Sequence, residues 1–217
     1  MRPARRVDRR LDGRAARRAH TPDRRLSRLN DGMSALTMGA PLTGLFSGSS
    51  EASLVSYALA FLIVTMRVKF WIDDMAFFED PLKGGDRSDR FFRIGMTFAI
   101  ASWVMFIVAG VMVRDPVVAG AWLLGALLVS TAWLVAEIVG PKSYRLQALW
   151  SASNAGYVTL AMVLVLSPWL GGVLGVEASW VQWFAILGMA LVLSVEIIKA
   201  DWLRSAAVQL GGETGGR

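Results

Sequence analysis

The layout of the chain is decided by residues 66–93, which read MRVKFWIDDMAFFEDPLKGGDRSDRFFR. This stretch carries six basic and six acidic side chains, whereas residues 52–65 before it and 94–113 after it carry no charge. A charged segment between two uncharged segments of helical length is typical of a connector between membrane-spanning helices. We therefore expect a multi-pass membrane protein, with a polar connector at 72–93 held in the cytoplasm by its lysines and arginines.

The composition of the chain supports this class. Of its 217 residues, 54% are hydrophobic and 18% are charged, which is too apolar for an ordinary soluble domain. There is no cysteine, and the one histidine, His20, lies in the arginine-rich first segment. These counts exclude disulfides, thiolate chemistry and a metal centre of histidines or cysteines within the membrane.

Residues 1–32 differ from the rest, because they contain 11 of the 23 Lys and Arg residues. This basic head could bind anionic lipid or, less plausibly, nucleic acid. We favour a disordered or mis-assigned head, with translation starting near Met33, because few apolar residues are present to offset the entropy of ordering. Residues 33–51 are interrupted by Gly39, Pro41 and Gly44 and are predicted to form a flexible lead.

The remaining chain predicts an all-α integral membrane protein, a bundle of five transmembrane helices within residues 52–204. A helix of 20 residues rises about 30 Å, which matches the hydrocarbon core of a bilayer. We expect Arg67 and Lys69, near the end of the first span, to extend their charges toward the membrane surface. The tail at 205–217 is expected to be flexible. The uncharged runs place the spans at about 52–71, 94–113, 117–139, 153–170 and 180–198.

Five spans put the two termini on opposite sides of the membrane. From residue 33 onward, 11 Lys and Arg residues then share the side of the connector, and Arg114 alone lies on the other side. Basic residues in short loops set orientation, so we expect the N-terminus outside and the C-terminus inside a bacterial-type inner membrane. The expected partners are the lipid bilayer and further copies of the chain or other membrane subunits.

Glu137 and Glu196 are the deepest acidic residues, each near the cytoplasmic end of its span. Ionisable residues in a membrane are functional candidates because burying them is costly. A structural role is nevertheless favoured, with Glu196 pairing with Lys199 three residues on and Glu137 reaching toward Lys142 or Arg145. Glu137 has no basic residue three or four positions away. It is therefore the better candidate to bind a proton or a cation.

Four acidic residues of the connector, Asp73, Asp74, Glu79 and Asp80, offer the hard oxygen ligands that Mg²⁺ prefers. They would suit a Mg²⁺-dependent membrane enzyme that acts on a lipid phosphate. A solvated face balanced by nearby basic residues is the favoured interpretation, because on a helix the four acids do not all share one face. No cofactor is therefore expected, with Mg²⁺ as the alternative.

Pairs of small residues four positions apart let membrane helices approach closely. No phosphate-binding loop, nucleophile elbow or dinucleotide fingerprint is present. We therefore predict a small component of transport or channel type, or of a membrane-complex assembly, and the Mg²⁺-dependent enzyme is the alternative. The candidate helix-packing pairs are Gly95 with Ala99, Ala121 with Gly125, and Ala152 with Gly156.

Overall fold

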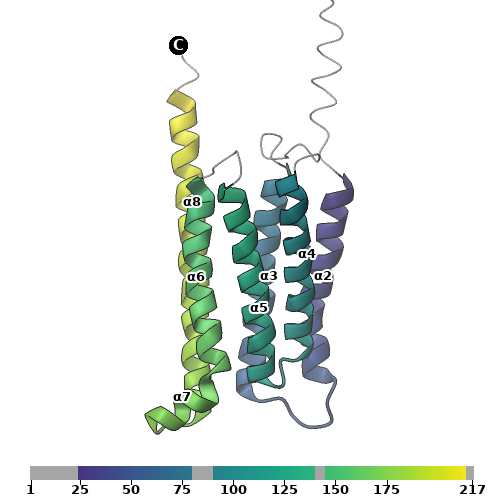
Figure 1. The fold of residues 1–217 in the computed structure, drawn as a ribbon, viewed down its shortest axis with the longest axis vertical. Coiled ribbons are helices and arrows are strands. Elements are labelled where there is room, and N and C mark those ends of the chain that lie inside the picture. Colours follow the sequence, from purple (N-terminus) through teal and green to yellow (C-terminus); the bar gives the residue numbers. More distant parts are fainter. Residues whose placement is uncertain (1–23, 80–89, 140–144, 214–217) are drawn as a thin grey trace, which may run out of the picture.

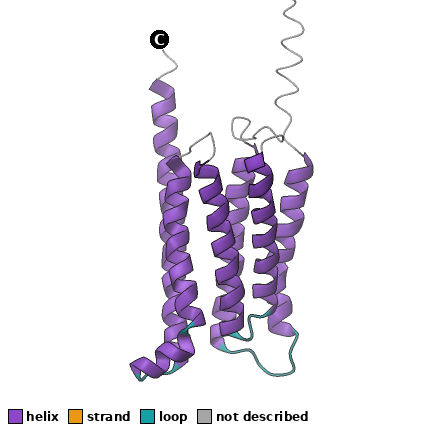
Figure 2. Cartoon of the chain, in the orientation of Figure 1, coloured by secondary structure: helices purple, strands orange, loops and turns teal. Residues whose placement is uncertain are grey.

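A computed structural model describes residues 24–79, 90–139 and 145–213. Within these ranges every regular element is an α-helix and there is no strand (Figure 2). The prediction of an all-helical chain is confirmed for this part. The helices are α2 (Arg24–Phe46), α3 (Leu54–Glu79), α4 (Arg90–Val111), α5 (Pro116–Val139), α6 (Arg145–Val165), α7 (Ser167–Leu174) and α8 (Ala178–Glu213).

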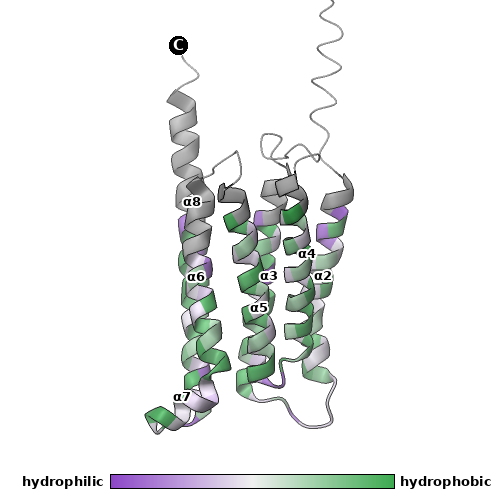
Figure 3. Cartoon of the chain, in the orientation of Figure 1, coloured by the Kyte–Doolittle hydropathy of each residue, from purple (hydrophilic) through white to green (hydrophobic). Residues whose placement is uncertain are grey.

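The long helices run alternately up and down beside one another (Figure 1). We call the end at which α3 finishes and α4 begins the connector end, and the end at which α4 turns into α5 the turn end. The first residue of α2 and the last residue of α8 both lie at the connector end (Figure 1). Hydrophobic residues line most of the length of α4 and α5 (Figure 3).

Four helices of the described residues are long and apolar enough to cross a membrane. Their apolar segments agree with the spans expected from sequence at 52–71, 94–113, 117–139 and 180–198. Helices α6 and α7 make a fifth span if this bent pair is counted as one. The four segments are Leu54–Asp73, Ile94–Val111, Pro116–Val135 and Ala178–Lys199.

The expected span at 153–170 is divided in the structure. Helix α6 ends at Val165, and α7 leaves it at an angle of 70°. Pro168 is the physical reason, since it lacks the N–H that a continuing helix needs and its fixed φ suits the first turn of a new one. The expected span at 153–170 would place Pro168 two residues before its end, whereas the proline lies in the first turn of α7.

The turn between α4 and α5 shows why the bundle reverses direction where it does. The Asp115 side chain accepts hydrogen bonds from the backbone N–H groups of Val117 and Val118, each at 3.1 Å. An aspartate in this position satisfies amides that lack partners inside the helix, and Pro116 fits its first turn. Helix α5 therefore starts at Pro116.

Helix α2 differs from the expectation of a disordered head and a flexible lead, because residues 24–46 form one helix. It packs against α3 and α4. A Cβ atom added to Gly44 would lie 2.4 Å from the carbonyl oxygen of Gly110, so the two backbones nearly touch. Glycine and proline are tolerated in such helices because neighbouring helices supply contacts.

The polarity of α2 is inverted relative to that of a helix on a soluble protein. Asn30, Ser34 and Thr37 are buried, whereas Leu36 and Phe46 are 60% and 76% exposed. A helix that turns polar groups inward and apolar groups outward fits an apolar surrounding.

Candidate functional site

Two basic residues of α3 are turned into the bundle. Both lie in the apolar segment Leu54–Asp73, and Arg67 is only 2% exposed and Lys69 is also buried. The sequence argument expected both to extend toward the membrane surface, and this expectation was wrong. Buried charge is stable only when it is paired or hydrogen-bonded, so the partners of these residues define the candidate site.

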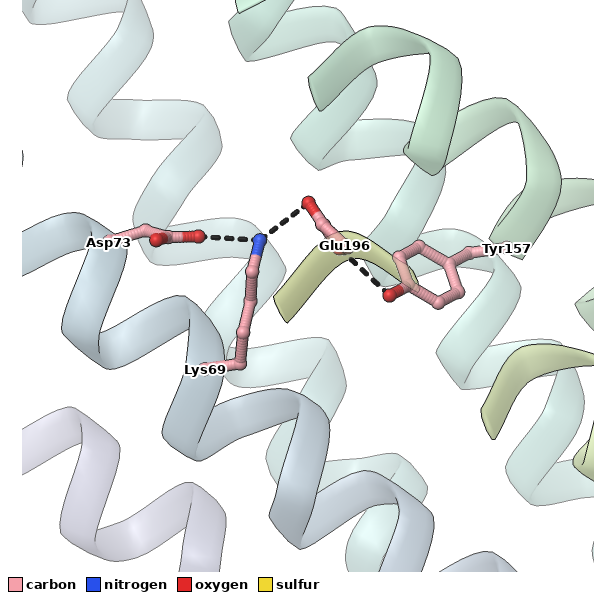
Figure 4. Close-up of polar contacts among 4 residues, drawn as sticks. All are labelled: Lys69, Asp73, Tyr157 and Glu196. Carbon is pink, nitrogen blue, oxygen red and sulfur yellow. Dashed lines mark hydrogen bonds and ion pairs between the residues drawn. The ribbon is translucent and has the colours of Figure 1, made fainter. Parts of the chain in front are cut away.

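Lys69 lies at the centre of a cluster built from three helices (Figure 4). Its Nζ is 2.5 Å from Oε1 of Glu196 on α8 and 2.5 Å from Oδ2 of Asp73, one turn further along α3. The Tyr157 hydroxyl on α6 donates to Oε2 of Glu196 at 2.8 Å. Both carboxylate oxygens of Glu196 are thus bound by groups from other helices.

The cluster lies just inside the connector end of the spans. Glu196 precedes the end of its apolar segment, at Lys199, by three residues, and Lys69 precedes Asp73 by four. At 1.5 Å per residue these positions are about 5–6 Å deep. Phe70 packs edge-to-face on Tyr157, with centroids 6.3 Å apart, and its own centroid is 5.3 Å from the Lys69 ammonium. Aromatic rings therefore border the cluster.

The charge of Glu196 holds a contact between helices. An ionised Glu196 accepts from Lys69 and Tyr157, whereas a protonated Glu196 loses the charge that holds the ammonium. Lys69 would still face the carboxylate of Asp73 on its own helix. Protonation of one carboxyl group would therefore weaken the contact between α3 and α8 without leaving the ammonium alone.

Arg67 faces α2 and α4. Its Nε donates to Oγ1 of Thr37 at 3.1 Å and its Nη2 donates to Oγ of Ser34 at 2.9 Å. Its guanidinium carbon is 5.7 Å from the centroid of the Trp103 ring, within the range of a cation–π contact. Arg67 therefore fixes α2 to the bundle.

A buried amide on the same face of α2 lacks hydrogen bonds. The Asn30 side chain is fully buried, and neither its oxygen nor its nitrogen has a hydrogen-bond partner among the residues that the structure describes. One residue on, the Asp31 carboxylate accepts a hydrogen bond from Trp71 Nε1 at 3.0 Å. Residues before Met33 thus take part in packing, although an unpaired buried amide costs stability.

The two glutamates chosen from sequence have different outcomes. Glu196 contacts Lys69 and Tyr157, while Lys199, its expected partner, is exposed. The residues that neighbour Lys69 in the sequence gave no signal for its pairing with Glu196, because this pairing depends on how α3 packs against α8. Glu137 belongs to α5, but its side chain lies outside the described residues, so its role stays a prediction.

The proposed Mg²⁺ ligands are only partly described. Asp73 pairs with Lys69. The side chains of Asp74 and Glu79, and the whole of Asp80, lie outside the described residues. In the part of the chain that is described, no three His, Cys, Asp or Glu side chains are grouped to hold a metal ion. The Mg²⁺-dependent enzyme stays an alternative prediction.

Some residues of the proposed helix-packing pairs lie at contacts between helices, and others are exposed. Gly95 and Ala99 are buried, and Ala121 is exposed. Cβ atoms added to Gly125 and Gly156 would meet side chains of neighbouring helices at 3.2 Å and 3.5 Å. The side chain of Ala152 is not among those described. Among the described glycines, the closest approach to the backbone of another helix is instead that of Gly44 on α2 to α4.

Comparison with known proteins finds no matching family model, no matching curated protein and no matching solved structure. The contacts around Lys69 and Glu196 are therefore the observations that bear on function.

Proposed function

We propose that this chain is a multi-pass membrane protein of transport type that moves protons, with Glu196 as the group that binds the proton. The contact between Lys69 and Glu196 carries the proposal, because it places an ionisable pair between two helices inside the apolar segments. Charged residues at such positions mark ion and proton pathways in membrane proteins.

Energetics support a functional role for the pair. An apolar substitute for a buried ion pair is often as stable as the pair itself, so stability alone is a weak reason to keep charges inside a bundle. The pair joins α3 to α8, and Tyr157 adds α6, so a change in the charge of Glu196 reaches three helices.

The proposed step is a proton transfer to Glu196. An incoming proton bonds to a carboxylate oxygen of Glu196 and neutralises it, and the attraction between this group and the Lys69 ammonium is lost. Tyr157 and the cation beside Asp73 face the carboxyl group from α6 and α3. When the proton leaves, the charge pair re-forms. Alternation between paired and released states supplies the two-state element that transport requires.

We infer that α2 also crosses the membrane. Its 23 residues rise about 35 Å, and the uncharged part, residues 32–46, rises about 22 Å. The crossing therefore requires the first two turns, which carry Arg24, Arg25, Arg28 and Asp31, to lie in the headgroup region at the connector end. Its inverted polarity and its close approach to α4 support this placement. Six crossings put both chain termini at the connector end, whereas the sequence argument with five spans put them on opposite sides.

The distribution of basic residues supports a cytoplasmic connector end. Arg114 is the one Lys or Arg residue, of 23, that lies in the sequence between α4 and α5. The other 22 precede α2, follow α8, lie in the sequence between α3 and α4 or between α5 and α6, or belong to the connector-end half of a helix. This bias favours a cytoplasmic location for both termini. With six crossings, the arginines of the head agree with the rest of the chain.

Reconstitution tests the proposal. Proteoliposomes that contain a pH-sensitive dye and carry an imposed potassium diffusion potential should take up protons faster than empty liposomes. Glu196→Gln should abolish the difference, because the amide keeps the shape and cannot bind the proton. Glu196→Asp should retain part of it. Glu177→Gln, at an exposed acid between α7 and α8, should match the unaltered protein.

Two results would contradict proton transport. One is uptake by the unaltered protein that does not exceed that of empty liposomes. The other is full activity of Glu196→Gln, verified as folded by its elution as a single species in detergent.

A further inference from the structure

Helix α7 presents apolar side chains that no part of the described bundle covers. Trp169, Val173 and Leu174 are 64%, 63% and 65% exposed. The eight residues of α7, SPWLGGVL, include no charged group. In water this exposed apolar surface would be unfavourable.

The length of α6 places α7 beyond the hydrocarbon core. Helix α6 has 21 residues and rises about 31 Å, so by length it can cross the core on its own and the fifth span need not include α7. The 70° bend then directs α7 sideways at the turn end, away from α3, α4 and α5 in the view of Figure 1. The backbone is also non-helical at 175–177. Exposed non-helical backbone does not occur within the hydrocarbon region, so this segment belongs at its boundary.

We propose that α7 lies in the lipid headgroup interface of the leaflet at the turn end and inserts Trp169, Val173 and Leu174 among the acyl-chain ends. Tryptophan is enriched at this depth because its ring is apolar and its N–H is polar. Trp180, at the start of α8, is 68% exposed beside it and continues the aromatic surface. Glu177 is exposed between the two helices and marks the side that faces water.

Hydrogen bonds and a close backbone approach join α7 to the segment that follows it and to α8. Gln182 Nε2 donates to Ser167 Oγ at 3.2 Å, joining the start of α7 to the first turns of α8. The backbone N–H of Val176 donates to the carbonyl of Gly171 at 3.0 Å, and a Cβ on Gly171 would lie 2.9 Å from the carbonyl oxygen of Val176. Because these contacts join the two helices, the depth of α7 in the interface sets the depth at which α8 starts.

The absence of cysteine from the chain permits a clean labelling test. Val173→Cys and Leu174→Cys would each be labelled with the fluorophore NBD, and the protein would be reconstituted in vesicles of phosphatidylcholine and phosphatidylglycerol. Lipids with a doxyl group at carbon 5 or carbon 12 report shallow and deep contact, and iodide reports water. Two matched positions give reference depths: Ser49→Cys in the exposed loop at the same end, and Leu187→Cys on the exposed face of α8.

We expect the labels at 173 and 174 to be quenched at least two-fold more by shallow than by deep doxyl lipid. The label at 187 should show the reverse, and the label at 49 should respond mainly to iodide. Quenching of the α7 labels like that at position 49 would place α7 in water, and quenching like that at 187 would place it inside the core. Protection from both lipid and iodide would mean that a protein surface, such as a second copy of the chain, covers α7. Each of these three results would overturn the proposal, independently of proton transport.

Discussion

The Lys69 ammonium and the Glu196 carboxylate lie 2.5 Å apart, although 127 residues separate them in the sequence. Lys69 reaches the site from the middle third of α3, and Glu196 from the middle of α8. Because both are buried, each neutralises a charge that would otherwise be costly within the bundle. This relationship makes the stability of the protein depend on the two residues jointly.

A double-mutant cycle measures that dependence. Lys69→Met and Glu196→Gln, each alone, should lower the free energy of unfolding in detergent by about 1.5–3 kcal/mol, because each removes the charged contact between α3 and α8, while Tyr157 still donates to Glu196 and Asp73 still pairs with Lys69. The double variant should lose less than the sum of the two. Lys199→Met, which removes an exposed ammonium near Glu196, is the control and should change stability by less than about 0.5 kcal/mol. Additive losses would show that the two residues do not interact.

Tyr157 bonds to Glu196 through its hydroxyl group, and Tyr157→Phe tests this bond because it keeps the buried ring. Loss of the hydrogen bond to Glu196 should reduce the free energy of unfolding by about 1.5–3 kcal/mol, the range for a bond to a charged group. Tyr57→Phe is the matched control, because Tyr57 is exposed on α3. Denaturant unfolding of both variants provides the measurement. Equal stability of the two would mean that the Tyr157 hydroxyl does not support the carboxylate.

Hydropathy predicted most of the fold and little of the site. The uncharged runs located α3, α4, α5 and α8 because a membrane helix needs about 20 apolar residues. Hydropathy missed α2. Averaged along the sequence, the hydropathy of its polar inner face and its apolar outer face gives the value of a polar segment. It also missed the inward direction of Lys69, since a partner 127 residues away leaves no local pattern. Glu196 was found by its depth, but its partner was not.

The contact between α2 and α4 predicts a contrast between two glycines of one helix. Gly44→Ala should destabilise the protein by about 1–3 kcal/mol, because its Cβ would clash with the carbonyl oxygen of Gly110. Gly39→Ala, with no atom within 4 Å of the added Cβ, should be neutral or stabilising by up to about 1 kcal/mol. Thermal unfolding in one detergent compares them. Equal effects would mean that α2 does not dock as described.

Glu137 is tested by the same transport assay as Glu196. On the sequence argument it lacks a basic neighbour on its own helix, so Glu137→Gln should impair proton uptake and leave the bundle assembled. Size-exclusion chromatography in detergent checks assembly. A variant with unchanged uptake would show that Glu137 is an interfacial acid, and would leave Glu196 as the proton-binding candidate.

The number of crossings is tested by reporters whose activity depends on the side of the membrane. Fusion after Arg204 should be active only in a cytoplasmic form, and insertion near Asp115 only in an external form, because the basic residues concentrate at the connector end. A third reporter fused before Arg24 separates the two models of the N-terminal region. It should be cytoplasmic, since α2 starts at the same end at which α8 finishes (Figure 1).

The paired glycine variant provides the control for this last reporter. Gly44→Ala weakens docking of α2, so it should reduce the cytoplasmic signal before Arg24 more than Gly39→Ala does, while the reporters near Asp115 and after Arg204 keep their locations. An external reporter before Arg24 in the unaltered chain would mean that α2 does not cross. The five-span arrangement with an external N-terminus would then be correct, and the arginines of the head would have to be translocated against the bias that orients the other loops.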